Sequence, residues 1–397
     1  MPARNPDLVV PDLVVIGGGA IGLATAWRAA SAGLRVTLLD PDPGHGASWA
    51  AAGMLAPVTE VHYGELPLLA LNLASNGLWP SFAAELTELT GHDIGYRRTG
   101  TLMVARDTDD LAVLDRLLAY QRAHDLEVER LSSRECRQRE PRLSPRIRGG
   151  MLVPGDHQVD NRALVEALVV ACDKAGVERR AERADEVIVE ADRVTGVRAA
   201  GGTIACGRVL VAGGCWSASL GGLPPGMIPV RPVKGQLLHL RAPSAGRLIR
   251  SGARGARSGP ADPPLATGNI RGVDVYLVPR ADGRFVVGAT VEERGHDTTV
   301  TAGAVADLLR DAIELLPDIA ELELAEATAG LRPGSPDNAP MIGPAAIDGL
   351  VVAAGHYRNG ILLTPVTSAG IAELLTTGTL PEVLRPFSPR RFEGGTP

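Results

Sequence analysis

The sequence predicts a mixed α/β fold, and three features near its start support this prediction. Residues 13–16 (LVVI) form a short β-branched run typical of a strand buried on both faces of a parallel sheet. The glycine-rich run 17–22 (GGGAIG) follows directly, and the alanine-rich stretch 23–32 predicts a helix. A second apolar strand, 35–39, ends in Asp40. Together these segments make one complete βαβ unit.

This unit has the chemistry that a dinucleotide requires. Gly17 permits the tight turn after the strand, Gly19 lets backbone N–H groups approach the phosphates, and Gly22 lets the helix pack closely on the sheet. The Asp40 carboxylate is placed to accept hydrogen bonds from the adenosine ribose. The fingerprint by itself fits both NAD and FAD, and its position at the start of the chain favours FAD.

The rest of the chain predicts further helices and strands. Helices are expected over 68–89 with an interruption at Pro80, over 111–125, over 161–175 with Asn161 as N-cap, over 303–315 and over 360–376. Strands are expected at 186–190, 194–198, 208–212, 230–240, 275–279, 285–289 and 350–354. Residues 241–271 are rich in Gly, Ala, Pro and Arg, which indicates a long loop.

Composition limits the classes of protein that fit. The chain has 397 residues, 45% of them hydrophobic and 22% charged, as in compact globular proteins. The net charge of −6 gives no reason to expect nucleic acid as a partner, and no apolar run of about 18 residues predicts a membrane span. Asp7 and Asp12 interrupt the start of the chain, which does not resemble a signal peptide. Neither the four cysteines nor the histidines have the spacing of a metal site. We therefore expect a cytoplasmic protein with reduced thiols and no metal.

The segment 46–57 (GASWAAAGMLAP) consists mostly of small residues. Such residues allow the backbone to lie against a flat ring, which larger side chains would prevent. The alternative is the start of a helix with low-volume packing.

With this segment added, the chain resembles the amino-acid oxidase superfamily that includes D-amino acid oxidase and sarcosine oxidase. Within it, the chain is most similar to the glycine oxidases of thiamine biosynthesis. The matching stretches span nearly the whole chain in the family's order. They are VVIGGGAIGLATAWRAASAGLRVTLLD, ASWAAAGMLAP, VPGDHQVDNRALVEAL, VLVAGGCWS, PVKGQLL, YLVPRADGRFVVGAT, AGLRPGSPDNAPMIGP and AAGHYRNGILLTPVT.

The resemblance implies a Rossmann-like FAD-binding domain built from discontinuous segments, with an inserted substrate-binding domain of antiparallel sheet. The FAD-binding domain would comprise residues 1–85, 150–232 and 325–385, the substrate-binding domain 86–149 and 233–324, and a C-terminal tail 386–397. Sarcosine oxidases attach FAD through a cysteine close to the position of Arg332, and this chain has none there, so we expect non-covalent FAD. Relatives also imply a homotetramer.

Three side chains are the candidate catalytic residues, and the resemblance places each of them. The guanidinium of Arg332 presents a planar fork that matches a substrate carboxylate, and the phenol of Tyr276 would donate to the same carboxylate. Arg358 would lie near flavin and substrate. The alternatives are a surface charge for Arg332, a half-buried strand aromatic for Tyr276 and a turn arginine in solvent for Arg358.

The candidate cofactor-binding residues come from five places along the chain. They are Gly17, Gly19, Ala20, Ile21, Gly22, Asp40, Ser48, Ala52, Gly53, Met54, Val187, Gly355, Arg358, Asn359, Gly360 and Ile361. Val187 is expected on the adenine side, and Gly53 and Met54 beside the isoalloxazine. Backbone N–H groups at residues 359–361, at the start of the predicted last helix, would stabilise negative charge on the flavin. Val291 stands where a relative has methionine, which indicates a different pocket shape near the substrate.

The implied reaction is FAD-dependent oxidative deamination of glycine to the imine or glyoxylate. Oxygen would be the acceptor, hydrogen peroxide would be released, and the imine would feed thiazole synthesis. One methyl group is worth only about 1–3 kcal/mol of discrimination, so sarcosine and small D-amino acids stay open as substrates. One alternative is another oxidase or a dehydrogenase of the superfamily that acts on sarcosine, D-amino acids or proline. The other is a non-catalytic flavin-binding subunit, which would not need Arg332, Tyr276 and Arg358 together.

Overall fold

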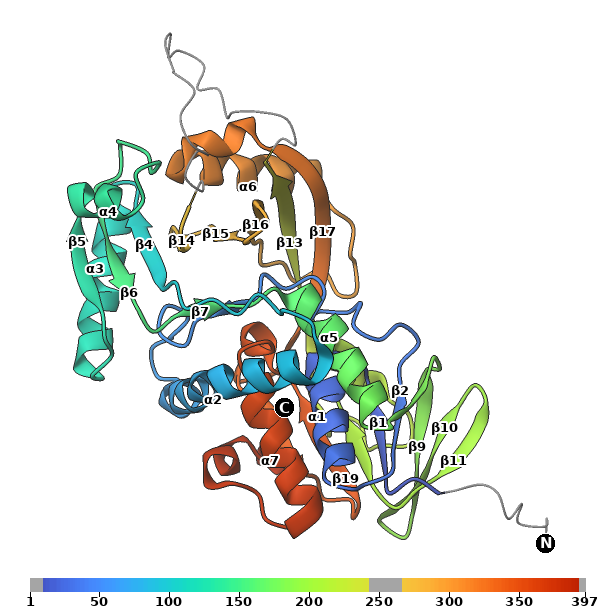
Figure 1. The fold of residues 1–397 in the computed structure, drawn as a ribbon. Helices are drawn as coiled ribbons and strands as arrows, with labels where there is room; N and C mark the ends of the chain where they lie inside the picture. Colours follow the sequence, from blue (N-terminus) through green and yellow to red (C-terminus); the bar gives the residue numbers. More distant parts are fainter. Residues whose placement is uncertain (1–9, 243–265, 393–397) are drawn as a thin grey trace, which may run out of the picture.

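Two large sheets and two small ones organise the part of the chain that the structure describes (Figure 1). The computed structural model describes residues 10–242 and 266–392. One large sheet has six strands, in the order β18 (Met341–Pro344), β19 (Leu350–Ala354), β12 (Val209–Val211), β1 (Leu13–Ile16), β2 (Val36–Leu39) and β8 (Glu178–Arg180). Every neighbouring pair in it is parallel except β18–β19. The predicted mixed α/β fold with a Rossmann-like unit is therefore confirmed.

Strand β1 is buried on both faces because different layers cover them. Leu13 and Val15 pack into a core shared with four helices: α1 (Ala20–Ser31), α2 (Leu66–Thr90), α5 (Asn161–Lys174) and α7 (Thr364–Thr377). Val14 and Ile16 pack against a three-stranded sheet made of β9 (Ala184–Glu190), β10 (Arg193–Ala199) and β11 (Gly202–Ala205). This two-sided burial explains why the run LVVI is apolar at every position.

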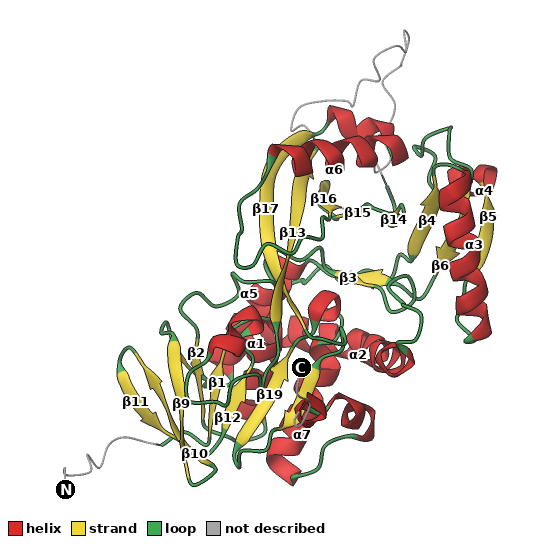
Figure 2. Cartoon of the chain, turned by 180° about the vertical axis from the view of Figure 1, so that it is seen from behind, coloured by secondary structure: helices red, strands yellow, loops and turns green. Residues whose placement is uncertain are grey.

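The second large sheet has eight strands (Figure 2). Its order is β17 (Glu323–Gly334), β13 (Arg231–Arg241), β16 (Arg284–Gly288), β15 (Tyr276–Pro279), β14 (Asn269–Arg271), β4 (Thr101–Ala105), β6 (Gly149–Val153) and β5 (Glu129–Ser132). Its pairs are antiparallel except β14–β4. Helix α6 (Ala302–Leu315) lies across the part of the sheet formed by β13 and β16. Side chains alternate between the faces: Leu238 packs with α6, whereas Leu237 packs with Ala50 from the small-residue segment.

The remaining elements are short or lie at the edge of the eight-stranded sheet. They are α3 (Thr108–Ala123), α4 (Ser133–Arg139), the paired strands β3 (Met54–Leu55) and β7 (His157–Gln158), and the 3₁₀ helices η1 (Gly214–Ser219), η2 (Pro317–Glu321), η3 (Tyr357–Asn359), η4 (Glu382–Phe387) and η5 (Pro389–Phe392). Helix α3 begins three residues before its predicted start, because the Asp107 side chain accepts from two backbone N–H groups and caps it.

Helix α2 is continuous, and the predicted interruption at Pro80 is wrong. Proline removes one backbone hydrogen bond from a helix, and tertiary contacts hold the helix on either side of it here. The Trp79 indole N–H donates to the Leu362 carbonyl at 2.9 Å, and Phe82 is buried against the Trp79 ring.

Two helix starts also differ from the prediction. Helix α5 is capped by Asp160, whose carboxylate accepts from the N–H groups of Arg162 and Ala163, and not by Asn161. Helix α7 begins at Thr364, because the 3₁₀ turn η3 and a further turn occupy the residues from 357 to 363. Most of the predicted 241–271 loop lies outside the described residues, and its last three residues form β14.

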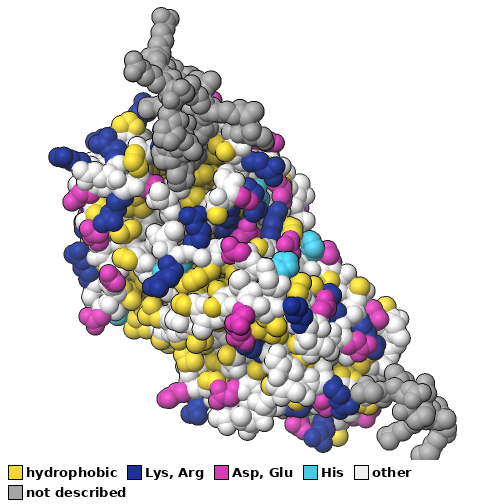
Figure 3. Space-filling view, in the orientation of Figure 1, with side chains coloured by type: hydrophobic (Ala, Val, Ile, Leu, Met, Phe, Trp, Pro, Cys, Tyr) yellow, Lys and Arg dark blue, Asp and Glu magenta, His cyan; other side chains and the backbone are white. Residues whose placement is uncertain are grey.

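The domain boundaries from the sequence stay a prediction. Strands β6 and β17 both pair within the eight-stranded sheet, while helix α2 packs against α5 and α7. On the face in Figure 3, acidic and basic side chains are interspersed and form no basic stripe. Among the described residues, no helix is long and apolar enough to cross a membrane, and no cluster of three or more His, Cys, Asp or Glu side chains fits a metal ion.

Candidate active site

A cavity of about 940 Å³ lies where the carboxyl ends of the parallel strands approach the eight-stranded sheet. Gly17 follows β1, Asp40 follows β2, Ala212 follows β12 and Gly355 follows β19, and all four line it. Ligands of open α/β sheets bind at this edge, because loops diverge there and helix N-termini point to it. The parallel sheet thus supplies one wall, and β13, β15 and β17 contribute to the opposite one.

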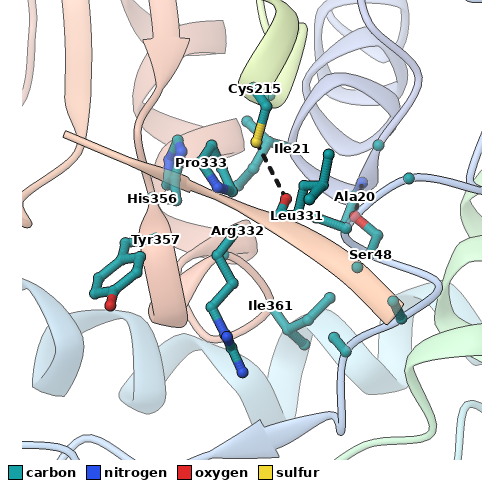
Figure 4. Close-up of a pocket in the computed structure, with 18 of the residues that line it drawn as sticks. Ala20, Ile21, Ser48, Cys215, Leu331, Arg332, Pro333, His356, Tyr357 and Ile361 are labelled. Carbon is teal, nitrogen blue, oxygen red and sulfur yellow. Dashed lines mark hydrogen bonds between the residues drawn. The ribbon is translucent and has the colours of Figure 1, made fainter. Parts of the chain in front are cut away.

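The glycine turn after β1 is closely fitted to its surroundings. Gly17 has φ +106°, and a Cβ there would lie 2.6 Å from the Ala212 carbonyl carbon. The Gly18 N–H donates to Asp40 Oδ2 at 2.6 Å, and the Ala20 N–H donates to Ser48 Oγ at 2.9 Å (Figure 4). Asp40 and Ser48, both predicted to bind the cofactor, therefore also stabilise the conformation of the turn.

The small-residue segment lies along the cavity as a series of turns that leads into β3, and is not a helix. Two buried side chains fix it. Asn161 Nδ2 donates to the carbonyls of Ser48 and Trp49 at 2.8 and 2.9 Å, and Arg280 Nη2 donates to the Ala52 carbonyl at 2.8 Å. These bonds hold the backbone against the cavity, where the sequence predicted a flat ring.

Arg332 projects from β17 into the cavity (Figure 4). Its Nη1 donates to the carbonyls of Thr290 at 3.0 Å and Lys234 at 3.3 Å. Within the described part of the chain, no carboxylate forms an ion pair with Arg332. Its charge is therefore available to an anionic ligand.

Two glycines make room for the predicted carboxylate-binding side chains. A Cβ on Gly235 would lie 2.5 Å from Arg332 Cζ, and a Cβ on Gly288 would lie 2.5 Å from Tyr276 Oη. Burial raises the pKa of Tyr276, and the charge of Arg332 acts in the opposite direction. The phenol is therefore protonated at neutral pH and can donate a hydrogen bond.

A third group at this end of the cavity was not predicted from the sequence. Glu60 forms an ion pair with Arg271 Nη1, and its other oxygen lies 3.7 Å from Arg358 Nε. Arg271 lies directly across from Tyr276 in the β14–β15 pair. No motif links Glu60, which lies in a turn, to Arg271 on β14, because 211 residues separate them and only the tertiary fold brings them together.

The structure brings nearly all the predicted site residues together. Arg332, Tyr276 and Arg358 line the cavity, as do all the predicted cofactor-binding residues except Gly22 and Val187. A Cβ on Gly22 would collide with the Gly17 carbonyl, which fits its predicted role in helix packing. Val187, in the middle of β9, is fully buried in the core, and the residues of this region that line the cavity are Arg183, Ala184 and Asp185.

Features of the cavity fit FAD. The glycine turn provides close approach of backbone beside a helix N-terminus, which a pyrophosphate needs. Gly53 has φ +70°, and a Cβ there would collide with the Val159 carbonyl, so only glycine lets the small-residue wall take this position. The buried Nε of Arg358 has no hydrogen-bond partner within the described residues, so a bound group can accept from it.

Comparisons with known proteins agree with this geometry. The model of the FAD dependent oxidoreductase family matches residues 12–374. The glycine oxidase of Geobacillus kaustophilus is 35% identical over 96% of this chain and 97% of its own length. A crystal structure of glycine oxidase from that organism has a TM-score of 0.86 at 34% identity and covers 96% of this chain and 98% of that one. The bifunctional protein ThiO/ThiG of Synechocystis is 35% identical over 96% of this chain, which spans 54% of that longer protein.

Proposed function

This chain belongs to the FAD dependent oxidoreductase family, and we propose that it catalyses the oxidative deamination of glycine with non-covalent FAD. The observation that carries the proposal is Arg332, a cavity guanidinium whose two hydrogen-bond acceptors are carbonyls, beside the protonated phenol of Tyr276. Such a pair binds the carboxylate of a small amino acid. The relatives named glycine oxidase support glycine as that amino acid.

The chain's own residues bind and orient the substrate. The free face of the Arg332 guanidinium and the Tyr276 hydroxyl donate to the carboxylate, which fixes the position of the α-carbon. The glycine turn, Ser48 and Arg358 would hold FAD, together with the small-residue wall. When bound, FAD supplies the capacity to accept hydride from the α-carbon. Positioning does most of the work, so this reaction needs no side-chain base.

Oxygen is the proposed acceptor, with hydrogen peroxide as one product and the imine or glyoxylate as the other. The Synechocystis relative carries the name ThiO/ThiG, and glycine oxidation by this chain is proposed to feed thiazole synthesis for thiamine. We further propose a homotetramer located in the cytoplasm.

The first experiment adds glycine anaerobically to the purified protein and follows the visible absorbance of the flavin. Bleaching is the expected result, and air should then restore the colour with release of peroxide. A yellow protein that stays yellow would reject glycine, and sarcosine, D-alanine and D-proline would be tested next. A colourless protein that FAD cannot restore would overturn the proposal of a flavoenzyme.

Arg332→Ala tests the carboxylate anchor. The expected result is a loss of glycine affinity of at least tenfold, because a hydrogen bond to a charged group contributes about 1.5–3 kcal/mol. An unchanged dissociation constant for glycine would show that the carboxylate binds elsewhere.

A further inference from the structure

Three guanidiniums and two carboxylates occupy the substrate end of the cavity. Arg271 forms an ion pair with Glu60, and Arg358 Nε lies 3.7 Å from Glu60 Oε2. Arg332 donates to the carbonyls of Lys234 and Thr290 and interacts with the Tyr276 phenol, and no carboxylate of the described residues pairs with it. The second carboxylate, Asp274, is 67% exposed and pairs outward with Arg106 at 3.1 Å. Of these two carboxylates Glu60 is the less exposed, with 11% of its side chain accessible, and the one that pairs inside the cavity.

Glu60 is held in place from both sides. The backbone N–H groups of Val58 and Thr59 and the Thr59 hydroxyl donate to buried Asp156, at 3.1, 3.2 and 2.6 Å. These bonds fix the turn that ends at Glu60. Burial raises the pKa of Glu60, and the charges of Arg271 and Arg358 more than offset this and lower it below the usual value. The carboxylate is therefore ionised and stays with its partners.

We propose that Glu60 is a specificity-determining residue that restricts the cavity to amino acids with one carboxylate. Its charge occupies Arg271, which lies across from Tyr276 and would otherwise attract a second acidic group of the substrate. Arg332 is then left as the one carboxylate anchor. A dicarboxylate such as iminodiacetate would bring its second charge towards an ion pair that is already complete, and like charges placed together oppose binding. This inference rests on the proposed oxidation of a small amino acid.

The test measures binding of two matched ethers to the FAD-loaded enzyme by calorimetry. Methoxyacetate has one carboxylate, and diglycolate is the same ether with a second one. The wild type should prefer methoxyacetate. In Glu60→Gln the ratio of the two dissociation constants should shift at least tenfold towards diglycolate, the size of one charge-assisted hydrogen bond. The double variant E60Q/R271Q should return the ratio close to the wild-type value, because it removes the released guanidinium.

Two further variants separate selectivity from general damage. Asp318→Asn breaks a half-buried ion pair with Arg142 of 2.7 Å, whose residues do not line the cavity, and should leave the ratio unchanged. Arg271→Gln leaves less positive charge beside the Glu60 carboxylate. It should therefore shift the ratio of the two dissociation constants in the opposite direction, towards methoxyacetate. This variant also serves as the test if Glu60→Gln does not fold.

An unchanged ratio in Glu60→Gln, or a ratio in Arg271→Gln that moves towards diglycolate, would overturn the inference. So would a double variant that keeps the shifted ratio, because the freed Arg271 would then not be its cause. Failure of glycine to bleach the flavin would instead overturn the proposed function. The binding ratios would still be measurable in that case, so the two failures can be distinguished.

Discussion

Gly235→Ala should weaken carboxylate binding without unfolding the protein. The new Cβ would lie 2.5 Å from Arg332 Cζ and closer still to both terminal nitrogens, whereas ordinary contact begins at 3.4 Å. The guanidinium must therefore move by about 1 Å. It is the free end of a flexible side chain, so it can move, but its 3.0 Å bond to the Thr290 carbonyl would be disturbed.

The expected loss follows from that displacement. A shift of about 1 Å in a positioning group can cost about 100-fold, and one charge-assisted hydrogen bond is worth about 1.5–3 kcal/mol. We therefore expect the dissociation constant for glycine, measured anaerobically by flavin reduction, to rise about 10- to 100-fold. The dissociation constant for methoxyacetate, measured by calorimetry, should rise to a similar extent. The midpoint of thermal unfolding should change by no more than a few degrees.

Gly303→Ala is the matched control, because nothing lies within 4 Å of a Cβ at this exposed position of α6. It should bind like the wild type. If Gly235→Ala also bound glycine within twofold of the wild type, the conclusion that this glycine sets the position of Arg332 would be refuted. A large drop in the unfolding midpoint together with the loss of binding would indicate damage to the sheet instead.

Three further predictions concern other groups. Tyr276→Phe should raise the dissociation constant for glycine at least tenfold, because a hydrogen bond to a charged carboxylate contributes about 1.5–3 kcal/mol; an unchanged dissociation constant would contradict its role. Burial lowers the pKa of His356 to about 3, whereas the same residue in the unfolded chain has a pKa near 6.5. As the pH falls, His356 therefore binds a proton in the unfolded chain before it does so in the folded protein. The free energy of unfolding is therefore unaffected by this histidine above about pH 6.5, and it decreases progressively between pH 6.5 and pH 3. The free energy of unfolding, measured with urea, should therefore fall between pH 7 and pH 4.5 by about 2–3 kcal/mol more in the wild type than in His356→Gln. Burial raises the pKa of all four thiols to about 11 or 12, so a thiol reagent should modify none of them in the native protein and all of them in urea: Cys136, Cys172, Cys206 and Cys215.

The sequence by itself determined the βαβ unit and the residues of its turn. Residues 13–16 are apolar at each position because layers on both faces bury them, and Gly17 is glycine because its φ of +106° and the nearby Ala212 exclude a side chain. These requirements are local, so one segment reveals them. The family resemblance added Arg332 and Tyr276, which the structure places in one cavity.

Tertiary structure alone decided how distant side chains meet. The Glu60–Arg271 pair spans 211 residues, and the glycine that makes room for Arg332 lies on a neighbouring strand, in the Val233–Arg332 register of β13 and β17. The burial of Val187 away from the cavity and the continuity of α2 through Pro80 also depend on packing against other segments. A local pattern cannot specify these contacts, because they follow from the register of the sheets and from which face of each strand meets the cavity.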